Sequence, residues 1–343
     1  MRVAMFDQPG KPLAITTVAD PTPEEDQVVV KVGRCGICSS DLHMTEGHGF
    51  TLPPGAVPGH EFSGEVVALG KGVTHVAVGD LVSVLPALSC GRCRSCLGGM
   101  PFACELGSRT LGVGPTWGGY AEYAVAGGRW CVGLPSGLSM DDGALIEPLA
   151  VGLHGVRLAN LQAGDDVLII GAGPVGLAAA YWARRLGAGR VAVTASSNRR
   201  EELARTMGAD LFILPGEGQS LVDATIAAFG GKADVVLECS GVPGMLDRSI
   251  ASVRRNGTVV VLGICSEPET ITALPAVMNE VVLRFAFAAD RREFEVCLDA
   301  LAKGGVEPRA MITGAVTLEE TPAMFEALRT SKTHSKVMIN PWG

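Results

Sequence analysis

Four cysteines lie close together in one short stretch of the chain. Their spacing is Cys-x2-Cys-x2-Cys-x7-Cys, and the residues are Cys90, Cys93, Cys96 and Cys104. Four thiolates at this spacing can surround one Zn²⁺ ion in a closed tetrahedron, and neighbouring glycines allow the loop to wrap around the ion. Because no coordination position stays open, we predict a structural zinc site. Free or disulfide-bonded thiols are the alternative, but ten cysteines in a chain without an apolar signal stretch do not favour disulfides.

A glycine-rich turn follows an apolar run in the middle of the chain. Val167–Ile170 predicts a buried strand, and the residues up to Leu186 are compatible with a helix. In the Gly-x-Gly-x-x-Gly motif between them, the first glycine permits a tight turn, the second lets the backbone approach a phosphate, and the third allows close packing. We therefore predict a dinucleotide site at the helix N-terminus, with an ordinary structural turn as the alternative. The residues expected to form it are Gly171, Gly173, Pro174, Val175 and Gly176.

Further potential metal ligands and proton carriers are dispersed along the chain. Three stretches carry them: Cys38-Ser-Ser40-Asp41-x-His43, Gly59-His60-Glu61 and Glu147-Pro148-Leu149. Taken alone, each stretch is ambiguous. A single histidine such as His60 is more often an ordinary polar residue, and Cys35-x-x-Cys38 is also the spacing of a redox pair.

Two kinds of element must position these residues. Residues 1 to about 150 are rich in glycine, proline and short β-like runs, which predicts a small barrel-like β domain. These runs are Val28–Val32, Phe62–Leu69 and Val73–Val84, the last with a turn at Gly79-Asp80. From Asp165 onward strands and helices alternate, which predicts an α/β fold with a doubly wound parallel sheet. The expected strands are Val167–Ile170, Arg190–Thr194, Asp210–Leu214, Asp234–Glu238 and Gly257–Leu262, and helices are expected at Asn198–Met207 and Pro243–Val253.

A sixth strand is expected at the edge of this sheet. Val281–Phe287 is apolar, and an apolar edge strand favours aggregation unless it is paired or covered. We predict that it pairs with its own copy in a dimer, and a covering loop is the alternative. After it, Glu293–Lys303 and Leu318–Thr330 are expected to be helices, and Lys336–Asn340 a last strand.

Composition limits the class of protein. A length of 343 residues favours two domains, and 47% hydrophobic with 19% charged residues is typical of a folded chain. The net charge of −8 and the lack of basic runs argue against nucleic-acid binding. Val167–Ala183 is apolar, but it is short and contains glycines and a proline, which disfavours a membrane span. We therefore expect a cytoplasmic protein that binds neither nucleic acid nor membrane.

Taken together and in this order, the motifs resemble the zinc-dependent medium-chain alcohol and polyol dehydrogenases. The resemblance covers essentially the whole chain. It implies a GroES-like catalytic domain made of residues 1–149 and 286–343, which includes a structural-zinc lobe at 88–106. It also implies a Rossmann dinucleotide-binding domain at 150–285, with the active site in the cleft between the domains.

The resemblance assigns roles to the dispersed residues. Cys38, His60 and Glu147 match the ligands of a catalytic zinc, whose fourth position stays open for water or substrate. Glu61 either exchanges with water as a further ligand or only neighbours the metal. Asp41 matches the residue that orients His60. Cys35 matches a position that is not a ligand, so the redox-pair interpretation is dropped.

The resemblance also implies a path for the proton that alcohol oxidation releases. Ser40 matches a relay hydroxyl beside the substrate oxygen, and His43 matches the outer relay residue, reached through the nicotinamide ribose. Lys336 lies where a basic residue often approaches the cofactor pyrophosphate. By family position, the apolar walls of the substrate pocket are Phe50, Trp117 and Phe287.

The end of the second predicted strand bears on the choice of cofactor. NAD-dependent members of the family place an acidic residue there, but this chain has Ala195, which removes its repulsion of a 2′-phosphate. Ser196, Arg199 and Arg200 can bind such a phosphate. We therefore expect NADP(H) in preference to NAD(H), with use of both cofactors as the alternative.

The expected function is hydride transfer between NADP(H) and a secondary alcohol, diol or polyol, or the corresponding ketone or aldehyde. Two zinc ions per chain are expected, one catalytic and one structural, in a homodimer or homotetramer. One alternative is a threonine-type amino-alcohol dehydrogenase that uses NAD. Another is a non-catalytic relative that only binds NADPH.

Overall fold

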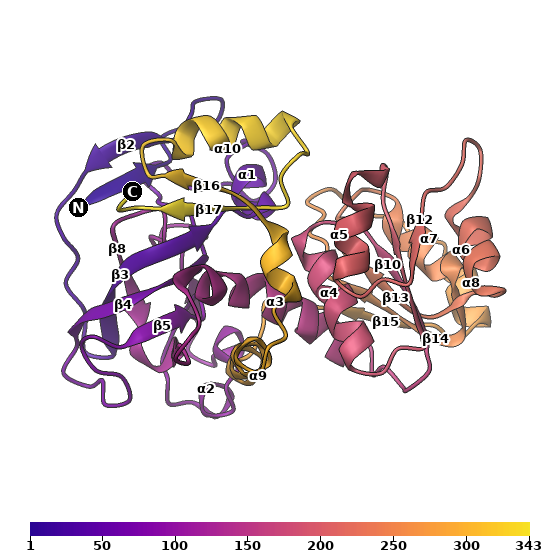
Figure 1. The fold of residues 1–343 in the computed structure, drawn as a ribbon, viewed down its shortest axis with the longest axis horizontal. Coiled ribbons are helices and arrows are strands. Elements are labelled where there is room, and N and C mark those ends of the chain that lie inside the picture. Colours follow the sequence, from indigo (N-terminus) through magenta and orange to yellow (C-terminus); the bar gives the residue numbers. More distant parts are fainter. The chain divides into compact units, whose positions relative to one another are not determined.

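The computed structural model describes the whole chain, Met1–Gly343 (Figure 1). The chain forms two compact units. The first contains Met1–Glu147 and Ala289–Gly343, and the second contains Pro148–Ala288. No helix combines the length and the apolar character that a membrane span needs.

The first unit is built on a seven-stranded sheet in the order β16-β17-β3-β4-β5-β9, in which β8 also pairs with β3. All neighbours are antiparallel except β16 and β17. The strands are β3 (Gln27–Gly36), β4 (Glu61–Leu69), β5 (Leu81–Val84), β8 (Tyr123–Gly127), β9 (Cys131–Gly133), β16 (Ile312–Thr317) and β17 (Lys336–Asn340). Two small ladders pair β1 (Arg2–Met5) with β2 (Ala14–Thr17), and β6 (Ala87–Ser89) with β7 (Ser108–Thr110).

Helices of different lengths connect these strands. The α-helices are α1 (Ser39–His43), α2 (Arg94–Leu97), α3 (Met140–Leu158, which continues into the second unit), α9 (Arg291–Ala302) and α10 (Thr321–Thr330). The 3₁₀ helices are η1 (Pro101–Ala103), η2 (Gly128–Trp130) and η4 (Glu307–Met311).

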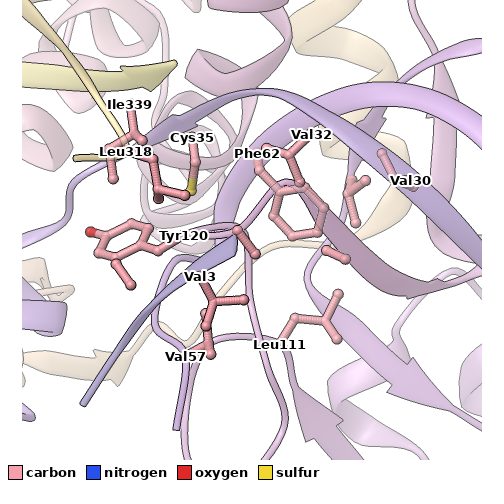
Figure 2. Packing of buried hydrophobic residues seen from close by; sticks show 14 of the residues in the cluster. Val3, Val30, Val32, Cys35, Val57, Phe62, Leu111, Tyr120, Leu318 and Ile339 are labelled. Atoms are coloured by element: carbon pink, nitrogen blue, oxygen red, sulfur yellow. The ribbon is translucent and has the colours of Figure 1, made fainter. Parts of the chain in front are cut away.

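The core of the first unit follows from the alternation of side chains along β3. Val30 and Val32 are two residues apart and therefore share a face, where they are buried together with Phe62 of β4 (Figure 2). Tyr120 and Cys35 are buried in the same cluster. Burial raises the pKa of the Cys35 thiol well above its usual value, which keeps it neutral in the core.

The second unit contains a six-stranded parallel sheet in the order β12-β11-β10-β13-β14-β15. The predicted doubly wound α/β sheet is thus confirmed, with β15 at its edge. Its strands are β10 (Asp166–Ile170), β11 (Arg190–Thr194), β12 (Leu211–Ile213), β13 (Ala233–Glu238), β14 (Val253–Val261) and β15 (Val282–Phe285). Its helices are α4 (Pro174–Arg185), η3 (Asn198–Arg200), α5 (Glu201–Thr206), α6 (Leu221–Phe229), α7 (Met245–Ser252) and α8 (Ala273–Met278).

One predicted β run is mostly loop. Within Val73–Val84 the predicted turn at Gly79-Asp80 is present, but only β5 after it is a strand, because the residues before it follow another turn, in which the N–H of Val73 donates to O of Gly70 at 3.1 Å. Gly79 has φ +94°, and the side chain of Asp80 accepts a hydrogen bond from the backbone N–H of Ala77 at 2.8 Å.

The predicted helix Pro243–Val253 is shorter than expected at both ends. Its start is delayed to Met245 because Gly244 adopts φ +80°, outside the helical region. At the other end, Val253 already belongs to β14.

Candidate active site

The pairing of β3 with β4 brings the dispersed candidate ligands together. Gly36 at the end of β3 pairs with Glu61 at the start of β4. Cys38 follows β3 as the N-cap of α1, and His60 immediately precedes β4. At Gly36 an added Cβ would lie 2.1 Å from Oε2 of Glu61, so a side chain there would displace the carboxylate.

The side chains at this end of the strand pair form a compact donor set. One ligand atom each from Cys38, His60 and Glu61 lie within 4.8 Å of one another. Ser40 donates a hydrogen bond from Oγ to Sγ of Cys38 at 3.1 Å, and its Oγ lies 3.5 Å from Nε2 of His60. Thiolate, imidazole and carboxylate are ligand types of zinc, so these residues fit that ion.

A buried carboxylate lies beside the imidazole. Oδ1 of Asp41 is 3.2 Å from Nδ1 of His60, and neither atom has another hydrogen-bond partner. Burial works to lower the pKa of His60, but Asp41 and the Cys38 thiolate outweigh it, so this pKa is raised well above its usual value. The surroundings therefore favour positive charge at this point, which a metal ion can supply as well as a proton.

Glu61 and Lys336 form a buried ion pair next to this cluster. Both carboxylate oxygens of Glu61 accept hydrogen bonds from Nζ of Lys336 at 2.6 Å, and O of Ile37 accepts a third at 3.1 Å. Burial works to lower the pKa of Lys336, but Glu61 more than offsets it, and the pKa is raised. Because the Lys336 side chain is only 1% exposed and its amine is held by Glu61, the expected contact with a cofactor pyrophosphate is not supported.

Glu147 is half-buried on α3. Its carboxyl is not part of the set of ligand atoms that lie within 4.8 Å of one another. Burial raises its pKa to about 7, with His60 and Lys336 opposing this rise and Glu61 adding to it. A metal ion nearby would stabilise the charged form of the Glu147 carboxyl. This is consistent with Glu147 joining Cys38 and His60 as a ligand only when the metal binds.

Ser40 and His43 lie on the same short helix in different surroundings. Ser40 contacts the candidate metal ligands, whereas His43 is largely exposed, with Nδ1 3.4 Å from Oε2 of Glu46. A proton path requires one group at the reacting atoms and another at the solvent, and α1 supplies both.

The four clustered cysteines also come together. Their sulfur atoms all lie within 4.8 Å of one another, and none of the ten cysteines of the chain forms a disulfide. Backbone hydrogen bonds from residues 96 and 105 lower the pKa of Cys93 to about 6, whereas burial raises that of Cys96 to about 12. Four sulfurs at this separation fit a structural zinc ion.

The glycine-rich turn lies between β10 and α4. Gly171 has φ +105°, and Gly173 is the N-cap of α4. A Cβ added at Gly176 would lie 1.9 Å from O of Gly171, whereas a Cβ added at Gly173 would meet nothing within 4 Å. The turn is therefore closed at the third glycine and open at the second, where a phosphate would approach the helix N-terminus.

The segment after β11 lies against this turn. The N–H of Gly171 donates a hydrogen bond to O of Thr194 at 2.8 Å, and Nη1 of Arg200 donates to O of Ala172 at 2.8 Å. Burial lowers the pKa of Arg200, and the charge of Arg199 adds to this effect. Ala195 directly follows β11, so no carboxylate stands at the position expected for binding a ribose.

Comparison with known proteins identifies the family. Residues 24–136 match the family model of the alcohol dehydrogenase GroES-like domain, and residues 174–303 match that of the zinc-binding dehydrogenase. The chain is 33% identical over 333 residues to sorbitol dehydrogenase of Bacillus subtilis (strain 168), which covers 96% of this chain and 94% of that protein. The chain belongs to the zinc-dependent medium-chain dehydrogenase/reductase family.

Other similar members of this family differ in substrate and cofactor. An L-threonine 3-dehydrogenase of Saccharopolyspora erythraea is 35% identical over 336 residues, which is 97% of each chain. A protein of Sinorhizobium meliloti 1021, solved bound to NADP, is 32% identical with a TM-score of 0.88 and 99% of each chain covered. An alcohol dehydrogenase of E. coli CFT073, solved with NADH, is 28% identical with a TM-score of 0.90 and the same coverage.

Membership in the medium-chain family confirms the predicted fold and class of enzyme. The fold combines a GroES-like β-rich domain with a Rossmann-type parallel sheet. The protein is a zinc-dependent oxidoreductase of alcohols or polyols that uses a nicotinamide cofactor. Because its relatives are dehydrogenases and reductases, the non-catalytic alternative is set aside.

The three residues expected to form apolar substrate walls have different surroundings. Trp117 is half-buried against the core of the first unit, and its Nε1 donates a hydrogen bond to O of Gly55 at 3.0 Å. Phe50 of the first unit and Phe287 of the second are both largely exposed. Trp117 thus packs against the core of the first unit, so its role as a wall of the substrate pocket stays a prediction, as do those of Phe50 and Phe287.

Sequence reasoning missed two residues beside the site. Tyr120 donates a hydrogen bond from its hydroxyl to Oδ2 of Asp41 at 2.7 Å, and nothing in the spacing of these two residues indicates that contact. Glu46 contacts His43. Their spacing could have predicted this contact, because residues three apart on a helical turn face the same side.

Proposed function

We propose that this protein transfers a hydride between NADP(H) and a secondary alcohol, diol or polyol, or the corresponding ketone or aldehyde. In this proposal Cys38, His60 and Glu147 hold the catalytic zinc, which lowers the pKa of the alcohol when bound. Ser40 takes the proton from the substrate oxygen, and His43 passes it to solvent. The contacts of Ser40 with Cys38 and His60, and the exposure of His43, support this order.

In the same proposal, Glu61 acts as a neighbour of the metal. Both of its carboxylate oxygens are occupied by Lys336, which supports this role over that of an exchangeable ligand. Cys90, Cys93, Cys96 and Cys104 hold a second, structural zinc, and the separation of their sulfurs supports it. The catalytic domain then corresponds to residues 1–149 and 286–343, with the zinc lobe at 88–106, and the dinucleotide domain to residues 150–285.

The preference for NADP(H) rests on the segment after β11. Ala195 stands where an acidic residue would repel a 2′-phosphate, and Ser196, Arg199 and Arg200 offer donors to it. The hydrogen bond from Arg200 to O of Ala172 ties this guanidinium to the glycine turn. The relative solved with NADP supports the choice, and the relative solved with NADH makes NAD(H) the alternative.

The first experiment measures turnover at 340 nm with NADPH and, separately, NADH across ketones, aldehydes, diols and polyols. We expect a higher kcat/KM with the phosphorylated cofactor. Ala195→Asp should move the preference toward NADH by roughly tenfold or more, because a carboxylate would face the 2′-phosphate. If Ala195→Asp left the ratio of kcat/KM with NADPH to kcat/KM with NADH unchanged, the assignment of the segment after β11 to the 2′-phosphate would be contradicted. A higher kcat/KM with NADH in the natural sequence would overturn the proposed preference for NADP(H).

Threonine oxidation is the second candidate, because a threonine dehydrogenase is among the most similar relatives. It requires a cation for the substrate carboxylate. Lys336 is already held by Glu61, and we identify no other dedicated cation in the first unit's site. L-threonine therefore belongs in the substrate panel, and turnover of it that exceeds all polyols and simple alcohols would replace our choice of substrate class.

We also propose that the second unit pairs with its own copy through β15. Large apolar side chains on β15 and the nearby α8 are 42–70% exposed, namely Leu274, Val277, Met278, Val282 and Phe285. An edge strand with an apolar patch of this kind favours self-association. Sedimentation velocity should show a dimer or tetramer, and a monomer at micromolar concentration would contradict this proposal.

A further inference from the structure

Asp41 binds different partners through its two carboxylate oxygens. Oδ2 accepts hydrogen bonds from the backbone N–H of Cys38 at 3.1 Å and from the hydroxyl of Tyr120 at 2.7 Å. Oδ1 lies 3.2 Å from Nδ1 of His60 and accepts no hydrogen bond from any other residue. The two bonds to Oδ2 therefore fix the carboxylate so that Oδ1 is directed at the imidazole.

The ring of Tyr120 has little freedom to move. Its side chain is completely buried in the core of the first unit, beside Cys35 (Figure 2). The ring meets Phe325 of α10 edge-on, with centroids 6.3 Å apart. It also lies against Gly59, where an added Cβ would be 2.4 Å from Cδ1 of Tyr120. Tyr120 thus contacts both the residue that precedes His60 and the carboxylate that faces it.

We propose that Tyr120 is a positioning residue for the catalytic metal site. Its hydroxyl holds Oδ2 of Asp41, so that Oδ1 accepts the proton on Nδ1 of His60 and Nε2 keeps its lone pair for the metal. A metal-bound histidine usually depends on such a partner at its other nitrogen, and Tyr120 acts one step further out. This inference rests on the proposed assignment of His60 as a zinc ligand.

The chemistry of the phenol is consistent with this role. Burial raises the pKa of Tyr120 well above its usual value, and the charge of Asp41 adds to the rise. The hydroxyl therefore stays protonated and remains a donor. A phenylalanine would fill the same space in the core but would leave Oδ2 with the Cys38 N–H alone, so the hydroxyl can be tested separately from the packing.

The test compares Tyr120→Phe with Tyr123→Phe, which removes a hydroxyl from β8 without touching Asp41. The zinc-loaded enzymes are titrated with a competing chelator, and bound zinc is measured by mass spectrometry. Tyr120→Phe should weaken one of the two zinc sites by about tenfold, at the low end of the effect of removing a direct partner of a ligand. Tyr123→Phe should match the natural sequence, and the cysteine-bound zinc should be unchanged in both.

A double-mutant cycle distinguishes the loss of the hydrogen bond between Tyr120 and Asp41 from a general loss of folding or packing. In the background of Asp41→Asn, where the carboxylate is already gone, Tyr120→Phe should weaken zinc binding much less than it does alone. Equal effects in the two backgrounds, or equal affinities of Tyr120→Phe and Tyr123→Phe, would overturn the inference. If the natural sequence itself holds a single zinc, the proposed catalytic site fails, which is a different outcome from the failure of Tyr120 alone.

Discussion

The two candidate metal sites of the first unit are assembled in opposite ways. The cysteine cluster takes all four sulfurs from one loop, residues 90–104, and needs little from the rest of the fold. The Cys38 cluster takes its donors from both strands at one end of the β3–β4 pair and is surrounded by the buried charges of Asp41 and Lys336. A closed structural site can be encoded by local spacing, whereas a site that keeps a position open depends on distant residues for its geometry.

The largest expected effect comes from making the same substitution in both clusters. Cys38→Ser should lower turnover by about a thousandfold or more, because it removes a proposed ligand of the catalytic zinc, and should change Tm little. Cys93→Ser should leave turnover nearly intact at low temperature but should destabilise the fold by about 3 kcal/mol or more. Turnover, calorimetry and zinc content measure the two effects. Similar losses of turnover in both variants, well below either Tm, would contradict the division of roles.

The next effect tests how much the buried ion pair of Lys336 and Glu61, beside the candidate catalytic site, contributes to the stability of the fold. Lys336→Met leaves the carboxylate of Glu61 buried without a partner, which should cost about 3–5 kcal/mol in urea unfolding. Lys303→Met provides the matched control, because Lys303 pairs with Asp299 at 2.7 Å on the surface and its loss should matter little. Restoration of stability by the further change Glu61→Gln would locate the cost in the unpaired charge. A Lys336→Met variant as stable as the control would show that the pair is dispensable.

The smallest expected effect concerns the start of α3, the helix that carries Glu147. Burial works to raise the pKa of Asp142, but hydrogen bonds from Arg309 and Ser139 outweigh it and lower that pKa. A lowered pKa in the folded state gives stability that is complete above the unfolded value of about 4 and is lost as the pH falls through the folded value. Asp142→Asn should therefore flatten the fall of Tm in acid, and Arg309→Gln should flatten it in the same way. If the dependence of Tm on pH below about 4 were unchanged in both variants, the contribution of the Asp142 carboxylate to stability would be contradicted.

Much of the architecture could be predicted from local patterns. The strand Arg190–Thr194 and the final strand Lys336–Asn340 have the predicted bounds, because apolar runs flanked by turns specify buried strands. The parallel sheet follows from the alternation of strand and helix, and the predicted edge strand is found at the edge as β15, whereas the order of the other strands was not predicted. In the run from Val73 to Val84 the predicted turn at Gly79 and Asp80 is confirmed, but the valines before it form no strand, because the chain turns again at Gly70–Val73.

The candidate site was predictable in its residue types but not in its supporting contacts. Cys38, His60 and Glu61 belong to recognisable motifs, and the structure brings them together. The contacts of Lys336 with Glu61 and of Tyr120 with Asp41 join residues 275 and 79 positions apart. No local period or spacing indicates such pairs, because they arise from sheet pairing and core packing.

The pairing of Gly36 with Glu61 has a consequence for where this chain can change length. Neighbouring residues of a strand point to opposite faces, so one residue inserted within Arg34–Gly36, where the pairing with β4 is regular, would turn the following side chains over and shift Cys38 away from His60. The loop between β4 and β5 is held at both ends by backbone hydrogen bonds, but Thr74 and His75 in its middle are exposed, and a longer connection there costs little entropy. Insertions that add a tag or a new binding loop should therefore be tolerated between Thr74 and His75 and not at the end of β3.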